Sequence, residues 1–178
     1  MNKPLSSFSD SAEPACPSDT DCYSLLQRAG CPGKVIDHAR AVRAVADLFT
    51  GDEAVSRCIV ESGALLHDIG RSESHFLDHA VRGGDLCREQ GVAKEVARVV
   101  ACHLGAGLSA DECLQLGLLP RDCMPHTLPE KIVAHADNLV KGTTVIHIEG
   151  QLMKNLLISR KKRKRMFRLS LEMDLFLK

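Results

Sequence analysis

Apolar residues recur every three or four positions along most of the chain, which predicts amphipathic helices. The clearest apolar stripes fall in five segments, 34–49, 53–67, 79–90, 94–103 and 127 to about 140. Gly91 follows the third segment, where a helix commonly ends in a left-handed residue. No segment alternates apolar and polar residues as a half-buried strand does, and no internal repeat is present. We therefore predict an all-α fold.

Two helix starts can be placed more closely because they carry capping-box signals. Ser109 precedes Glu112 by three residues, and Thr127 precedes Glu130 in the same way. In a capping box each side chain satisfies a backbone N–H of the first helical turn. We expect a short helix after Ser109 and a longer one after Thr127.

The length of 178 residues favours one domain with tails. Residues 1–20 are rich in Ser, Pro and Asp, and we expect them to be disordered. A helical domain over 21–150 and a C-terminal helix with a basic tail over 151–178 complete the predicted organisation. The chain contains neither a long apolar run nor the apolar core of a signal peptide. We expect a cytoplasmic protein that does not engage a membrane.

Eight cysteines are spread along the chain, and no two have the C-x-x-C spacing of a zinc knuckle or thioredoxin-type site. Because no secretion signal is present, we expect reduced thiols. Cys58 and Cys102 lie in helical patterns and are expected to be small core residues.

The charge is distributed unevenly, although the chain as a whole is neutral. Residues 160–168, "RKKRKRMFR", contain seven basic side chains, whereas residues 1–159 hold 15 Lys and Arg against 21 Asp and Glu. Two interpretations of this basic segment are open. It is either a solvated terminal helix or disordered extension, or a surface that binds RNA phosphates nonspecifically.

Several ionisable side chains lie on stripes that are otherwise apolar. Asp137 shares a helix face with Val133 and Val140. An isolated buried carboxylate is costly unless it is paired, protonated or bound to a metal. Four histidines fall on such stripes too, and Asp68 directly follows one of them; the four are His38, His67, His79 and His103.

The remaining four histidines lie in polar surroundings. His135 aligns with Lys131 and Asn138, which predicts a surface position. The other three are expected in loops or on the surface, and they are His75, His126 and His147.

One inward histidine alone would suggest a hydrogen-bonded core residue. Six inward imidazoles and carboxylates from five helical segments suggest a metal site, because these ligands suit Fe, Mn, Zn or Ni. Helical bundles commonly build such sites from facing side chains.

The order of these residues resembles the HD-domain superfamily of metal-dependent phosphohydrolases, and in particular the small archaeal HDIG proteins. The resemblance covers about residues 22–150 and rests on "LLHDIGR" (65–71), "DHAVRGG" (78–84), "ACHLGAGL" (101–108) and "EKIVAHADNLV" (130–140). It implies an HD-domain helical bundle with a metal site in its core.

The resemblance also implies which residues hold metal. A first ion would take His38, His67, Asp68 and Asp137. A second would take His79 and His103, with Asp68 bridging both ions. We expect two divalent or mixed-valence ions, with Fe or Mn before Ni, Co or Zn.

Hydrolysis of a phosphoester or phosphoanhydride bond in a nucleotide or another small phosphorylated molecule is the expected activity. Asp68 and Arg71 are the expected catalytic residues, and phosphate contacts are expected from Arg71, Arg82 and Lys141. Two alternatives stay open. One is a mononuclear HD 5′-nucleotidase, and the other is an RNA-binding adaptor that uses the basic tail.

The segment 104–125 contains three glycines and two prolines. It is either a substrate loop over the site or an ordinary connection between helices.

Overall fold

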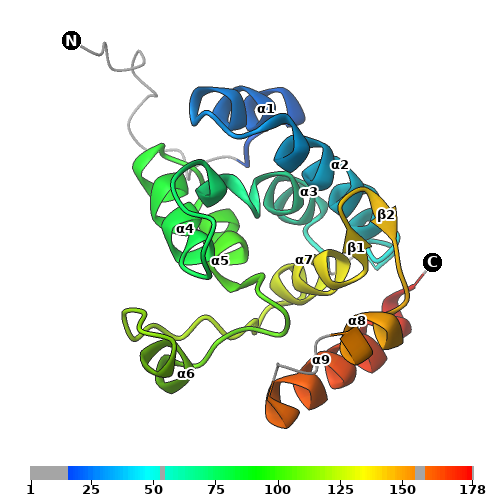
Figure 1. The fold of residues 1–178 in the computed structure, drawn as a ribbon. Helices are drawn as coiled ribbons and strands as arrows, with labels where there is room; N and C mark the ends of the chain where they lie inside the picture. The colour runs from blue at the N-terminus through cyan, green and yellow to red at the C-terminus, as the bar shows by residue number, and fades with distance from the viewer. Residues whose placement is uncertain (1–15, 53–54, 155–158, 178) are drawn as a thin grey trace.

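The computed structural model describes residues 16–52, 55–154 and 159–177, with the side chains of 153 and 154 excepted. Helices dominate it, as Figure 1 shows. The helices are α1 (Asp19–Arg28), α2 (Gly33–Asp47), α3 (Arg57–Leu66), α4 (His79–Glu89), α5 (Lys94–Cys102), α6 (Ala110–Gln115), α7 (Leu128–Asn138), α8 (Ile148–Lys154) and α9 (Arg160–Met173). The short 3₁₀ helices η1 (Ile69–Ser72) and η2 (Asp174–Phe176) follow α3 and α9.

The all-α prediction is confirmed, and both predicted capping boxes are present. Ser109 accepts a hydrogen bond from the Glu112 backbone at the start of α6, and Thr127 does the same for Glu130 at the start of α7. One small element was missed. Strands β1 (Val140–Lys141) and β2 (Thr144–Val145) form an antiparallel hairpin, which is too short to give an alternating pattern.

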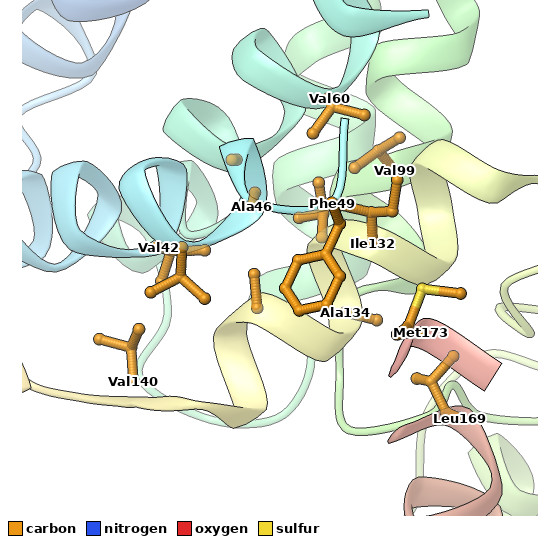
Figure 2. Close-up of a cluster of buried hydrophobic side chains, with 14 of the residues drawn as sticks. Val42, Ala46, Phe49, Val60, Val99, Ile132, Ala134, Val140, Leu169 and Met173 are labelled. Carbon is orange, nitrogen blue, oxygen red and sulfur yellow. The ribbon is translucent and has the colours of Figure 1, made fainter. Parts of the chain in front are cut away.

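The buried side chains form two main clusters around α3 and α5. One cluster joins α2, α3, α7 and α9, and Figure 2 shows part of it. The other cluster joins α1, α3, α4 and α5 and includes Leu26, Leu65 and Val96. Burial of this kind stabilises the fold by about 25 cal/mol for each Å² of apolar surface removed from water.

The beginning of the described chain differs from expectation, whereas the C-terminal segment is helical, which was one of the interpretations left open. Residues 1–15 lie outside the described part, but α1 begins at Asp19, inside the segment expected to be disordered. It begins there because Ser18 and Asp21 form a capping box that the composition of the segment concealed. The basic segment 160–168 belongs to helix α9, which packs against α7 through Met166, Leu169 and Met173, so it is not a disordered extension.

The cysteine prediction is wrong for one pair. Cys16 and Cys58 form a disulfide, and Cys58 is exposed rather than part of the core. The pair is separated by 42 residues, so no spacing motif could reveal it. The six other cysteines are free and buried, and Cys102 is a core residue as predicted.

None of the helices in the described residues has both the length and the apolar character of a membrane span.

A candidate metal centre

Two of the inward histidines occupy equivalent places at helix ends. His67 follows the last residue of α3, and His103 follows the last residue of α5. Each ring turns back on its own helix, so that Nδ1 lies 2.8 Å from the Ala64 carbonyl and 2.7 Å from the Val100 carbonyl respectively. The helix therefore fixes the orientation of each imidazole.

The other two inward histidines are held in the same way by loop carbonyls. His38, on α2, places Nδ1 2.7 Å from the carbonyl of Gly142 in the β1–β2 turn. His79 begins α4 and places Nδ1 2.5 Å from the carbonyl of Phe76.

A backbone carbonyl can only accept a hydrogen bond, so all four rings carry their proton on Nδ1. When such a ring is neutral, its Nε2 carries the lone pair that a metal ion would take. Metal-binding histidines are usually fixed in this tautomer by a hydrogen bond from the second nitrogen. The four rings are thus oriented as ligands by contacts that lie outside the cluster itself.

The Nε2 atoms converge on Asp68, which follows α3. Asp68 Oδ1 lies 3.0 Å from His79 Nε2 and 3.6 Å from His103 Nε2. Asp68 Oδ2 lies 3.7 Å from His67 Nε2. Asp68 therefore lies between His67 on one side and the pair His79 and His103 on the other.

Asp137 closes the other side of the cluster from α7. Its Oδ1 lies 3.0 Å from His38 Nε2 and 3.6 Å from His67 Nε2. Ligand atoms within 4.8 Å of one another form three sets: His38–His67–Asp68, His67–His103–Asp137 and Asp68–His79–His103.

The residues fit a bound cation because the cluster leaves buried polar atoms without partners. His67 Nε2 and Asp68 Oδ1 are buried and form no hydrogen bond. The Nε2 atoms of His79 and His103 face each other at 3.3 Å, although both rings have their Nδ1 proton committed elsewhere. Such uncompensated groups cost free energy in a protein interior, and a cation would satisfy them.

The charges inside the cluster shift the ionisation of its members. Burial alone would raise the pKa of Asp68 and of Asp137, but the neighbouring histidines outweigh it and hold both pKa values below the usual range. Burial lowers the pKa of His67. Both carboxylates are therefore ionised at neutral pH, as ligands must be.

A close approach between η1 and α4 brings His79 to the cluster. An added Cβ on Gly70 would lie 2.0 Å from the His79 carbonyl oxygen and 2.6 Å from the Gly83 nitrogen. Both contacts are with backbone, so only glycine fits at position 70. The glycine of the HDIG sequence thus has a structural cause, which the motif alone did not reveal.

The predicted phosphate-binding residues differ in their surroundings. Arg71 donates from Nε to Asp68 Oδ2 at 2.8 Å and reaches the rim of the cluster. Arg82 is exposed and forms an ion pair with Asp78, and Lys141 is exposed on β1. Their contact with substrate remains a prediction.

One of the four histidines that were expected in loops or on the surface is buried instead. His135 is 2% exposed, because α9 covers the face of α7 that it shares with Lys131 and Asn138. It packs edge-on against the Phe49 ring and lies outside the ligand sets. The sequence pattern predicted a solvated face because the helix that covers it, α9, lies far along the chain. The other three histidines are exposed as predicted.

The segment 104–125 extends away from the main helices and is held in place by hydrogen bonds. Leu108 pairs with Cys123, and Arg98 donates to the carbonyls of Asp122 and Met124. In Figure 1 its helix α6 lies apart from α2 and the hairpin. The segment contributes no member to the ligand sets, and a role in substrate choice remains a prediction.

Sequence comparison places the chain in a known family. The HD domain model matches residues 35–142, a range that contains all six residues of the cluster. The chain belongs to the HD-domain family. No solved structure matches the chain.

Individual relatives extend this finding. An uncharacterized protein of Methanocaldococcus jannaschii is 42% identical over 130 residues, which cover 70% of this chain and 76% of that protein. A tRNA (cytidine(56)-2′-O)-methyltransferase of Picrophilus torridus is 37% identical over 137 residues, which cover 77% of this chain but 40% of the enzyme. A ribonuclease Y of Thermosipho melanesiensis is 32% identical over 73 residues, which cover 40% of this chain and 14% of that protein. The chain thus spans about two fifths of the methyltransferase.

Proposed function

We propose that this protein is a metal-dependent phosphohydrolase that holds two ions and cleaves a phosphoester or phosphoanhydride bond in a nucleotide or another small phosphorylated molecule. One observation carries the proposal. Four histidines from four helical elements bind backbone carbonyls through Nδ1 and turn Nε2 toward two ionised carboxylates. Imidazoles oriented in this way beside ionised carboxylates suit bound cations, and His67 Nε2 and Asp68 Oδ1 have no hydrogen-bond partner without one.

The contacts support two ions rather than one. Asp68 belongs to the set with His38 and His67 and also to the set with His79 and His103. A mononuclear 5′-nucleotidase would need only the first of these sets. Two divalent ions would supply activation of water and neutralisation of phosphate charge.

The residues of the chain would keep the site ready for a phosphate. Asp68 stays ionised between the two sets, and Arg71 holds it by a hydrogen bond of 2.8 Å. The Arg71 side chain is 30% exposed, so its guanidinium also faces the solvent side. We assign Arg71 to the orientation of substrate phosphate, ahead of Arg82 and Lys141.

The names of two relatives bear on the substrate. The ribonuclease Y proteins and the tRNA methyltransferases both act on RNA by name. The methyltransferase is more than twice as long as the aligned segment, so its name assigns no methyl transfer to this chain. RNA phosphodiesters therefore belong among the substrates to be tested, beside mononucleotides and dinucleoside polyphosphates.

A panel of these substrates, assayed with Mn, Fe, Co, Ni, Zn and Mg, tests the proposal. We expect metal-dependent release of phosphate or nucleotide, lost in Asp68→Asn and retained in His126→Asn, a change at an exposed histidine. Metal-loaded protein that turned over no phosphorylated substrate while binding RNA would instead favour the adaptor.

Arg71→Ala tests the phosphate contact. Loss of a charge-assisted hydrogen bond costs about 1.5–3 kcal/mol, so kcat/KM should fall roughly 10- to 150-fold. Metal content should remain, because the metal ligands are retained. Arg88→Ala, on the surface of α4, should leave turnover unchanged. Normal turnover in Arg71→Ala would remove this residue from the site.

A further inference from the structure

Helix α9 presents a row of basic side chains to solvent. Its apolar face, with Met166, Leu169 and Met173, is buried against the body of the protein, which fixes the helix rotation. Figure 2 shows Leu169 and Met173 pointing from α9 toward α7. The residues left on the outer face of the first turns are Arg160, Lys161, Lys164, Phe167 and Arg168, all exposed.

One basic residue of α9 has a structural partner, and it anchors the helix. Arg165 donates two hydrogen bonds to the Glu112 carboxylate, at 3.0 and 2.8 Å, and one to the Gly107 carbonyl at 2.9 Å. None of the other six cations in 160–168 has an acidic partner within 4.0 Å among the residues that the structure describes. Their charge is thus available to something outside the protein.

The position of these cations is unfavourable for the helix itself. The positive end of a helix dipole lies at its N-terminus and favours acidic residues there. Helices α1, α6 and α7 follow this rule, whereas α9, like α2, α3 and α4, has no acidic residue in its first turn. The first turn of α9 instead contains Arg160, Lys161 and Lys162. Like charges at i and i+4, as in Arg160–Lys164 and Lys164–Arg168, add repulsion. An anionic partner would relieve both costs.

We infer that the outer face of α9, formed by Arg160, Lys161, Lys164, Phe167 and Arg168, binds the phosphate backbone of a single-stranded nucleic acid. The cations neutralise phosphates, and the Phe167 ring, 43% exposed among them, offers a surface on which an unpaired base stacks. A duplex would not present such a base. The proposal does not depend on the metal cluster or on hydrolysis.

The distribution of apolar residues along α9 argues against a membrane partner. A helix that lies in a membrane interface needs an apolar stripe along its length. The stripe of α9 is already buried against the protein, and the exposed Leu171 and Leu175 follow the cations along the axis. The first two turns of the outer face contain only Phe167 as an exposed apolar side chain.

Binding of a labelled single-stranded RNA to the full chain, followed by fluorescence anisotropy at several salt concentrations, tests the inference. Each neutralised phosphate of a single strand contributes about −0.7 to the slope of log K against log salt. We expect a slope of about −1.4 or steeper, the value for two phosphates. Single-stranded DNA should bind by the same contacts, and duplex RNA more weakly.

Two variants with the same change in net charge locate the surface. Lys161→Glu/Lys164→Glu/Arg168→Glu should weaken RNA binding at least about tenfold and flatten the salt slope. Arg28→Glu/Lys34→Glu/Lys94→Glu, at exposed positions on α1, α2 and α5, should bind almost as wild type does. Phe167→Ala should weaken binding to single strands but leave duplex binding unchanged. Metal content should be the same in all three variants, which separates this surface from the metal centre.

Three results would overturn the inference. They are absence of RNA binding by the wild type at about 50 mM salt, equal weakening by the two triple variants, and binding of anionic phosphatidylserine vesicles in place of RNA.

Discussion

Each histidine of the cluster is fixed by a contact that lies outside the cluster. The four Nδ1 atoms bind carbonyls of Ala64, Phe76, Val100 and Gly142, so the backbone sets the direction of every Nε2. The helical stripes predicted that these rings point inward. They could not reveal the Gly142 contact, because the β1–β2 turn reaches His38 from a position 104 residues away.

Gly70→Ala tests the close packing that positions His79. The new Cβ would meet backbone atoms of His79 and Gly83, so α4 must move away from η1. Overpacking of this kind costs about 1–3 kcal/mol, and displacement of His79 should weaken binding of the second ion. Urea unfolding and metal titration measure the two effects. Gly33→Ala, where an added Cβ meets nothing within 4 Å, should cost little; equal behaviour of the two variants would contradict this account.

His135 makes stability depend on pH. Burial lowers the pKa of its imidazole to about 4, from 6.5 for a free histidine side chain. The unfolded chain therefore takes up a proton between about pH 6.5 and 4 that the folded protein does not. The contribution of His135 to stability is thus fully present above this range and is lost as the pH decreases through it.

Replacing His135 by leucine removes this proton uptake. Between neutral pH and pH 5, the free energy of unfolding should decrease in both proteins. The decrease should be about 2 kcal/mol larger in the wild type than in His135→Leu. Contributions from the other histidines cancel in the comparison, and His126→Leu, at an exposed position, is the control. Parallel pH profiles for wild type and His135→Leu would contradict burial of this imidazole.

At the scale of elements, the sequence predicted the positions of helices but not the contacts between distant segments. Capping boxes and apolar stripes are local patterns, and they predicted the bounds of five helices to within a few residues: α2, α4, α5, α6 and α7. The cover of α7 by α9 and the Cys16–Cys58 disulfide join distant segments, so no periodicity predicts them. The amphipathic pattern of α9 was present in the sequence but was hidden by its charge.

Met173→Ala tests whether α9 belongs to the folded core. Met173 is fully buried between α9 and α7, so its truncation should lower the free energy of unfolding by about 2–5 kcal/mol. Leu175→Ala, two residues on and 81% exposed, should change it by less than about 0.5 kcal/mol. Chemical unfolding measures both. If Met173→Ala were neutral, α9 would be a dispensable extension.

The six residues of the metal cluster come from five helices or their ends. His38 comes from α2, His67 and Asp68 from the end of α3, His79 from α4, and His103 and Asp137 from the ends of α5 and α7. Bound ions would therefore connect five helices whose side chains otherwise leave buried groups unsatisfied. The family could be predicted from six residues in order, whereas the sequence left two interpretations of the basic segment open.

The number of ions per chain is the most direct test of the central claim. We predict two ions per chain in wild-type protein reloaded to saturation, freed of loose metal and measured by plasma mass spectrometry. His79→Ala and His103→Ala should each retain about one ion, and His126→Ala should retain two. One ion or fewer in the wild type, or an unchanged count in His79→Ala, would contradict the proposed binuclear centre.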